Sequence, residues 1–289
     1  MRSMGNMRIG SFQVLGTLGQ GAHSTILHIR RSADGKQYAL KIVPVRGQDD
    51  LKYVEQAEHE FRVSQRLHHP NLIKVHALEK RFRWLFWGLT EVRLLIEFVR
   101  GKTLDQVPLL PVVVQVQIFT RVADGLAHMH RRGVFHADLK PANILFGPNG
   151  QVKIIDYGLA WIEGQHKARI QGTPEYMAPE QLKHRLVNEK TDMFNFGATM
   201  YRLLTVRHIP PLIGPSGLAL DARNWENALK RVEQLNPDVP KALGDLVHRC
   251  LAYHPHKRPE TMSEVHQALQ ELEQKLVQSD ADRLDVYEV

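Results

Sequence analysis

The chain has 289 residues, of which 43% are hydrophobic, enough for one large domain or two smaller lobes with a real core. Its net charge of +7 is mildly basic, but no Lys/Arg-rich block with interleaved aromatic residues indicates a nucleic-acid-binding face. The single cysteine, Cys250, excludes an internal disulfide framework and is expected in the core, while the sixteen histidines show no spacing typical of zinc sites. No secretory signal and no apolar run of about 18 residues is present, so we expect a cytoplasmic protein without a membrane span.

The first strands surround a glycine-rich turn. Residues 12–30 alternate in polarity around Gly19-Gln20-Gly21-Ala22-His23-Ser24, which predicts two strands joined by a flexible turn. Glycines there allow backbone N–H groups to approach phosphates, although hairpin turns use glycine anyway. Residues 38–43 predict another strand, with Ala39 and Lys41 on one face. Burying Lys41 is costly unless a carboxylate pairs with it; snorkelling at a sheet edge is the alternative.

A helix is expected over residues 53–68, where apolar side chains recur every three or four positions. Glu58 and Glu60 on this helix are both candidates to pair with Lys41. Strands are then expected over residues 72–78 and 94–99.

The connection between these strands, residues 79–88, is dense in aromatic and cationic side chains. One interpretation is a long hairpin with one face on the core. The other is a surface patch that binds a partner. Gly101 marks a boundary, because it interrupts the strand pattern.

The remainder of the chain is predominantly helical. Residues 111–132 predict a helix with His130 on its apolar stripe, where a hydrogen-bonded core histidine is expected. A short strand at 152–155 follows, then a polar loop from 156 to 180. A mostly apolar helix opens at Asp192, and a capping box at Thr261 begins the final helix.

Chemistry-bearing residues gather in the stretch His136-Ala137-Asp138-Leu139-Lys140-Pro141-Ala142-Asn143. Asp138 can accept a proton from a hydroxyl, and Lys140 can neutralise a phosphate. Asn143 and the later Asp156 can hold a divalent cation through oxygen atoms. Residue types and spacing therefore favour a phosphate-handling site.

This stretch resembles the catalytic loop of eukaryotic-type (Hanks-type) serine/threonine protein kinases, and Asp156-Tyr157-Gly158 resembles the segment that follows it. The stretches Gly172–Glu180, Asp192–Gly197 and Cys250–Pro259 resemble further family segments in the same order. Their resemblance implies that Asp192 accepts backbone N–H groups of the catalytic loop. It also implies that Arg258 pairs with Glu180. Ala137 replaces the family's arginine, which makes this a non-RD variant, and a bacterial origin is one interpretation.

The resemblance covers residues 12–275 and implies an α+β, two-lobed fold with ATP between the lobes. A small strand-rich N-lobe with one main helix would span 12–99, and a larger helical C-lobe 100–275. Residues 1–11 and 279–289 are expected to be flexible tails.

The resemblance also implies the site. Lys41 would contact ATP phosphates, paired with Glu60 rather than Glu58 because of its spacing from His69-Pro70. Catalytic roles fall to Asp138, Lys140, Lys41, Glu60 and Thr173, with Mg²⁺, or Mn²⁺ in its place, on Asn143 and Asp156. The nucleotide would contact Leu18, Gly19, Gly21, Ser24, Ile26, Ala39, Lys41, Ile96, Glu97, Val99 and Leu145.

The implied function is transfer of the γ-phosphoryl group of Mg-ATP to Ser or Thr of a protein. A pseudokinase that binds without transfer is the alternative suggested by Ser24, Ala137 and Tyr157, which depart from the family pattern. A small-molecule kinase of the aminoglycoside or choline type is a further alternative, but such enzymes lack the Ala178-Pro179-Glu180 segment. Between Gly158 and Gly172 the chain offers no Ser, Thr or Tyr, so regulation by loop phosphorylation is not expected.

Overall fold

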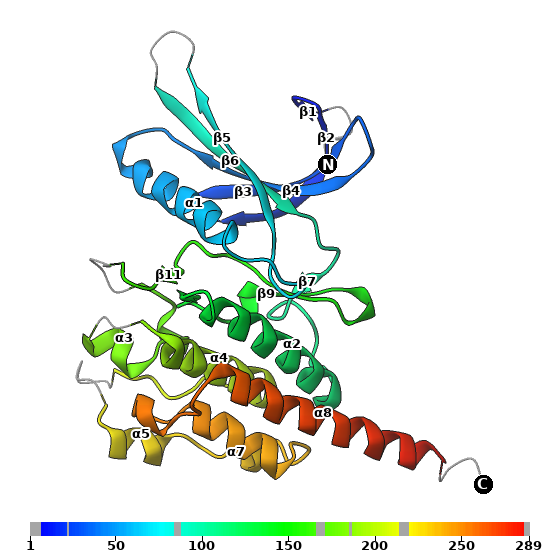
Figure 1. Ribbon diagram of the computed structural model, residues 1–289, viewed down its shortest axis with the longest axis vertical. Helices are drawn as coiled ribbons and strands as arrows, with labels where there is room; N and C mark the ends of the chain where they lie inside the picture. The colour runs from blue at the N-terminus through cyan, green and yellow to red at the C-terminus, as the bar shows by residue number, and fades with distance from the viewer. Residues whose placement is uncertain are drawn as a thin grey trace. The chain divides into compact units, whose positions relative to one another are not determined.

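The computed structural model describes residues 7–21, 23–83, 88–165, 171–184, 187–213 and 220–285, and it divides into two compact units. Unit 1 comprises residues 1–68, 72–100 and 156–158. Unit 2 comprises residues 69–71, 101–155 and 159–289. Strands predominate in unit 1 and helices in unit 2 (Figure 1), which confirms the expected α+β class.

Unit 1 is an antiparallel six-stranded sheet with one main helix. The strand order is β1-β2-β3-β4-β6-β5. The strands are β1 (Arg8–Ile9), β2 (Phe12–Gly21), β3 (Ser24–Arg31), β4 (Gln37–Pro44), β5 (Val75–Phe82) and β6 (Leu89–Glu97). The helix α1 (Leu51–Ser64) follows a short 3-10 turn, η1 (Gln48–Asp50).

The two faces of this sheet bury different cores. Period-two alternation places Ala39, Lys41 and Val43 of β4 on one face. The helix α1 packs against Val43 through the buried residues Val54 and Ala57. The face that carries Lys41 is therefore also the face that α1 covers, which is the precondition for an ion pair between them.

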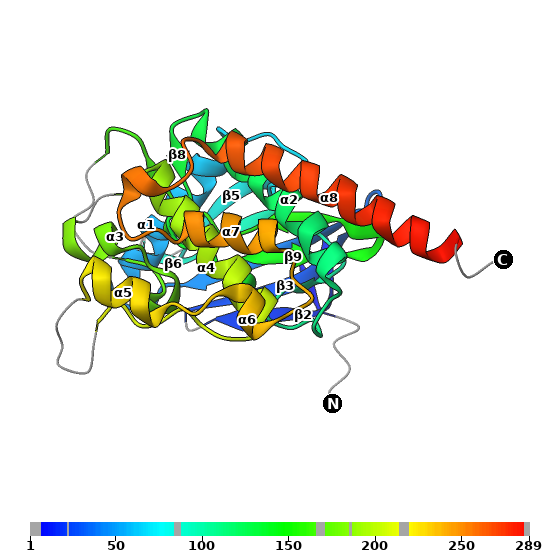
Figure 2. The same cartoon turned by 90° about the horizontal axis from the view of Figure 1, so that it is seen from below.

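Unit 2 contains seven helices among its described residues. They are α2 (Val112–His130), α3 (Pro179–His184), α4 (Glu189–Thr205), α5 (Ala222–Ala228), α6 (Val232–Leu235), α7 (Lys241–Cys250) and α8 (Met262–Asp285). Helix α8 lies lengthwise beside α2, as Figures 1 and 2 show. Helix α4 is buried along nearly its whole length, so it forms the centre of this unit.

Short strands and 3-10 turns connect these helices. The strands are β7 (Lys102–Thr103), β8 (Val134–Phe135), β9 (Ile144–Phe146), β10 (Val152–Ile154) and β11 (Trp161–Ile162), in sheets ordered β10-β9-β7 and β11-β8. The 3-10 turns are η2 (Pro141–Asn143), η3 (Pro148–Gly150), η4 (Pro174–Tyr176) and η5 (Pro255–Lys257). No described helix is both long and apolar enough to cross a bilayer.

Two expectations about the core of unit 2 are confirmed. Arg258 donates through Nη1 and Nη2 to the two carboxylate oxygens of Glu180, at 2.7 and 3.0 Å. Both residues are buried, so the paired geometry offsets the cost of removing two charges from water. Cys250 is buried, and burial raises the pKa of its thiol to about 12, as befits a core residue.

Several element boundaries differ from the sequence prediction. Helix α4 begins at Glu189 rather than Asp192, because the Asn188 side chain accepts a hydrogen bond from Thr191 N at 3.3 Å and caps the helix earlier. Residues 8–9 lie in an expected tail but pair with β2 as β1. Helix α8 continues to Asp285 within the other expected tail.

Some sequence hypotheses lie outside the described residues. The aromatic tip of the connection at 84–87, the turn residue Ala22, and the end of the acidic tail at 286–289 belong to this group. The same holds for 166–170 in the loop before Thr173.

Gly101, the expected boundary residue, begins the second stretch of unit 2 and passes close to β9. A Cβ placed there would lie 2.4 Å from the carbonyl oxygen of Phe146.

Gly101→Ala should therefore lower the free energy of unfolding by roughly 1–3 kcal/mol, since the backbone atoms of Phe146 cannot rotate away as a side chain could. Urea unfolding would measure the change. Gly16→Ala is the matched control, because a Cβ at Gly16 meets nothing within 4 Å; equal losses in both variants would contradict the close approach.

Candidate active site

The backbone of the expected catalytic loop is held by one buried carboxylate. Asp192 of α4 is fully buried and accepts the N–H groups of His136 and Ala137, each at 2.7 Å. His130 of α2 contacts the same carboxylate through Nε2 at 2.8 Å. Two N–H donors and an imidazole thus compensate the buried charge, and the expected role of Asp192 is confirmed.

Ala137 occupies a backbone conformation that L residues rarely adopt. Its φ is 66°, and left-handed backbone costs an alanine about 1 kcal/mol or more. The residue persists there because both of its peptide groups are engaged. Its N–H donates to Asp192, and its carbonyl oxygen accepts from Gln181 Nε2 at 3.0 Å.

The Asp138 carboxylate is almost completely buried and surrounded by donors. Thr173 donates to Oδ1 through both its backbone N–H and its hydroxyl, each at 2.8 Å. Lys140 Nζ lies 2.9 Å from Oδ2 and 2.6 Å from Thr173 Oγ1. The carboxylate, the ammonium group and the hydroxyl therefore form one compact cluster with fixed orientation, in which a hydroxyl group already lies against the carboxylate.

Asn143 is tied to the same loop. Its Nδ2 donates to the carbonyl oxygen of Asp138 at 2.9 Å, and its backbone carbonyl oxygen accepts Ile155 N at 2.9 Å. The side-chain nitrogen is thereby used internally. The amide oxygen is left as the atom that can ligate a cation.

In unit 1, Lys41 and Glu60 meet as expected. Lys41 Nζ lies 2.6 Å from Glu60 Oε2, whereas Glu58 pairs with Lys80. Burial disfavours the charged ammonium group, but the carboxylates of Glu60 and Asp156 outweigh it and raise the pKa of Lys41. A charged lysine is thus available to bind phosphate.

Asp156 also lies in unit 1, in a left-handed backbone conformation with φ 67°. Its Oδ1 accepts Gly158 N at 3.1 Å. The next residue, Tyr157, is fully buried, and its hydroxyl donates to the carbonyl oxygen of Ile73 at 3.0 Å. Burial raises the pKa of Tyr157, so the hydroxyl keeps the proton that it donates. The tyrosine therefore anchors the segment through a bond that phenylalanine cannot make.

The remaining residues expected at the nucleotide fall on neighbouring strands. Strand pairing places Ile26 opposite Lys41, Ala39 opposite Ile96 and Gly19 opposite Ile26. Directly opposed residues share a face, so Ile26, Ala39 and Ile96 line the Lys41 face of the sheet. The others are Leu18 and Gly21 on β2, Ser24 on β3, Glu97 on β6, Val99 just after it, and Leu145 on β9 of unit 2.

Sequence reasoning missed two buried amides. Gln181 joins three segments: its Nε2 donates to Ala137, and its Oε1 accepts Ala178 N at 2.9 Å and Asn195 Nδ2 at 3.1 Å. Asn195 also donates to the carbonyl oxygen of Tyr176 at 2.6 Å. The one sequence signal for these buried amides was the position of Asn195, a polar side chain inside an otherwise apolar helical stretch.

Comparisons with known proteins identify the family of the chain. Residues 12–271 match the protein kinase domain, which is nearly the whole chain. The chain therefore belongs to the protein kinase domain family.

Relatives come from distant organisms. A probable serine/threonine-protein kinase of Streptomyces coelicolor is 27% identical over 270 residues, 89% of this chain and 39% of that protein. The serine/threonine-protein kinase PrkC of Bacillus subtilis is 25% identical over 285 residues, 96% of this chain and 42% of that protein. The cAMP-dependent protein kinase type 3 of Saccharomyces cerevisiae is 29% identical over 252 residues, 86% of this chain and 61% of that protein. The chain thus spans less than two thirds of the length of each.

The stability that His130 contributes at Asp192 should depend on pH. Burial lowers the pKa of His130, but the carboxylates of Asp192 and Glu189 outweigh burial and raise it above the ordinary value. Because the pKa of His130 is higher in the folded state than in the unfolded state, protonation of His130 stabilises the fold. This stabilisation is fully present below the unfolded-state pKa of about 6.5, and it is lost as pH rises through the folded-state pKa. His130→Gln should therefore cost more free energy of unfolding at about pH 5.5 than at about pH 8.5, measured by urea unfolding.

The matched control is the exposed residue His256, whose replacement by Gln should cost little at either pH. A loss in His130→Gln that is equal at both pH values would contradict the proton linkage.

Proposed function

We propose that this chain is a serine/threonine protein kinase that transfers the γ-phosphoryl group of ATP to a Ser or Thr hydroxyl of a protein. The observation that carries the proposal is the cluster of Asp138, Lys140 and Thr173 on one rigid loop. Membership in the protein kinase domain family supports it. So do the names of the relatives, which are serine/threonine kinases.

Asp138 has the geometry to receive the acceptor's proton. An incoming hydroxyl would occupy a position like that of the Thr173 hydroxyl, which lies 2.8 Å from the carboxylate. The acceptor oxygen then forms its bond to the γ-phosphorus as the bond from that phosphorus to the bridging oxygen breaks, and ADP leaves. Lys140 Nζ, beside both groups, offsets negative charge on the transferring phosphoryl group.

The phosphate-binding lysine belongs to unit 1, and the two candidate Mg²⁺ ligands are Asn143 of unit 2 and Asp156 of unit 1. Lys41, kept charged by its carboxylate neighbours, binds phosphate oxygens, and Glu60 holds its ammonium group in one position. Asn143 and Asp156 offer amide and carboxylate oxygens, the hard donors that suit Mg²⁺. When bound, Mg²⁺ supplies neutralisation of charge on the phosphates.

The departures from the family pattern leave this chemistry intact. Ala137 contributes backbone contacts, and Tyr157 contributes a hydrogen bond away from the carboxylates. Neither replaces a charged group in the cluster. No observation favours the pseudokinase interpretation over transfer.

The proposal predicts a specific loss in Asp138→Asn. ATP affinity should change little, whereas turnover on a generic Ser-containing protein should fall by roughly 100-fold or more, since an amide cannot accept the proton. Radiolabelled phosphate transfer and a thermal-shift titration with ATP measure the two quantities. Asp49→Asn, at an exposed position, is the control. Near-normal transfer by Asp138→Asn would falsify the assignment.

Activity should not require phosphorylation of the loop before Thr173. In many relatives, the arginine that precedes the catalytic aspartate binds a phosphorylated loop residue through charge-assisted hydrogen bonds. Ala137 has no such donor, and Gln181 instead ties the loop's carbonyl to the segment after Thr173. Protein treated with a phosphatase and repurified should therefore phosphorylate a generic substrate at an unchanged rate.

Gln181→Leu provides the structural counterpart of this test. It should reduce that rate whether or not phosphatase was applied, because it removes the internal tie. A large loss after phosphatase treatment of the unmodified protein, restored by re-phosphorylation within residues 156–180, would overturn phosphorylation independence.

A further inference from the structure

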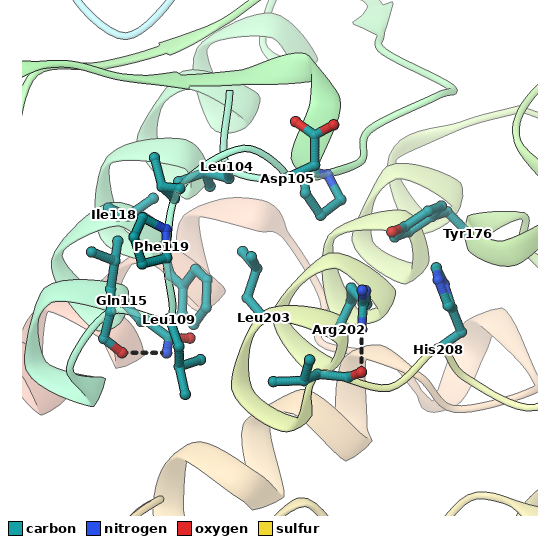
Figure 3. Close-up of a pocket in the computed structure, with 15 residues that line it drawn as sticks. Leu104, Asp105, Leu109, Gln115, Ile118, Phe119, Tyr176, Arg202, Leu203 and His208 are labelled. Atoms are coloured by element: carbon teal, nitrogen blue, oxygen red, sulfur yellow. Dashed lines mark hydrogen bonds between the residues drawn. The ribbon is translucent and has the colours of Figure 1, made fainter. Parts of the chain in front are cut away.

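A pocket of about 420 Å³ opens in unit 2 beside the catalytic loop. It is formed mainly by residues 104–110, the start of α2, and residues 202–208 at the end of α4, and Pro141 and Tyr176 complete its lining. Figure 3 shows apolar side chains, including Leu104, Ile118 and Phe119, on one side. Arg202, Tyr176 and His208 lie on the other side.

The pocket lies close to the place where phosphoryl transfer is proposed. Pro141, one of its lining residues, directly follows Lys140. Tyr176, another, ends the 3-10 turn that begins immediately after Thr173. Three residues of 3-10 helix span roughly 6 Å, and an extended peptide advances about 3.3 Å per residue. A substrate whose hydroxyl meets Asp138 would therefore bring a residue roughly two or three positions away to this pocket.

The chemistry of the pocket is apolar with one half-buried cation. The Arg202 guanidinium donates to the carbonyl oxygen of Val206 and lies within reach of the Tyr176 hydroxyl. Within the described part of the chain, no carboxylate lies within ion-pair distance of Arg202. Leu109 and Val206 at the rim are 66% and 58% exposed, an unusual exposure for large aliphatic side chains beside a cavity.

The other polar side chains do not neutralise Arg202. Burial and the Arg202 guanidinium both lower the pKa of His208, so its imidazole is uncharged at neutral pH. Asp105 is exposed, and its charge is therefore screened by water. Of the two charged side chains that line the pocket, Arg202 is the more buried, so water screens its charge less than that of Asp105.

We propose that this pocket selects the protein substrate by an acidic side chain roughly two or three residues from the acceptor hydroxyl, with its carboxylate on Arg202 and a neighbouring apolar side chain against Leu109 and Val206. The proposal rests on the proposed function. A carboxylate exchanges a neutral carbonyl partner for a charge-assisted, bidentate hydrogen bond with the guanidinium. A Lys or Arg in the same place would set two cations together, so basic sequences are disfavoured.

The test uses a positional-scanning set of fluorescent peptides with one central Ser, each flanking position carrying Glu, Ala or Lys in turn. Anisotropy titration measures binding to the full chain in its Asp138→Asn form, so that binding is read without turnover. At one flanking position Glu should bind about 10-fold more tightly than Lys, which corresponds to about 1.4 kcal/mol. Adding Arg202→Gln should remove that preference, and adding Arg202→Glu should reverse it.

Arg207→Glu is the matched control, because Arg207 is the exposed neighbour that does not line the pocket, and it should leave the preference intact. Equal binding of Glu and Lys peptides at every position, or a preference that survives Arg202→Gln, overturns the pocket assignment. Phosphate transfer by the unmodified chain is measured separately on the same peptides. Absence of transfer alongside an Arg202-dependent preference would overturn the kinase proposal alone.

Discussion

The catalytic loop depends on a single buried charge, the carboxylate of Asp192. Full burial of a carboxylate is costly unless donors surround it, and here both oxygens are occupied by N–H groups of the loop itself. In the conformation in which the loop donates to Asp192, Ala137 adopts an unfavourable left-handed backbone. The strain at Ala137 is thus offset by an electrostatic requirement elsewhere, and the position of the Asp138 carboxylate follows from it.

Each functional charge is fixed within its own unit by a similar arrangement. In unit 2, Thr173 and Lys140 orient the Asp138 carboxylate, and Arg258 holds Glu180 at the end of the same segment. In unit 1, Glu60 holds Lys41. Buried polar groups of this kind contribute little net stability, but they leave a side chain few alternative orientations. Phosphoryl transfer depends on the positions and charges of the surrounding groups, so fixed side-chain orientations serve this reaction even where they add little stability.

The sequence predicted those parts of the fold whose signals are local or ordered along the chain. Strand alternation and helical periodicity located the main elements. The resemblance to the kinase family, through its usual spacing, favoured Glu60 over Glu58 as the partner of Lys41. Contacts without a local signal were missed. Gln181 is an amide in a short helix, where such side chains usually face solvent, and only the fold shows that it lies between three segments. The extents of β1 and α8 also required pairing and packing that periodicity alone does not reveal.

The residues proposed for catalysis and those proposed for selectivity differ in burial. The residues proposed to move the proton and the phosphoryl group are buried and multiply bonded, whereas the pocket beside them combines a half-buried guanidinium with exposed aliphatic side chains. Arg202 makes its hydrogen bonds to neutral groups, so its replacement removes no buried ion pair. Asp192, on the same helix, cannot be replaced in this way, because each of its carboxylate oxygens accepts a backbone N–H group of the catalytic loop. Helix α4 therefore carries both a position that holds the catalytic loop and a position whose charge can change without disturbing that loop. The proposed selectivity rests on the second position.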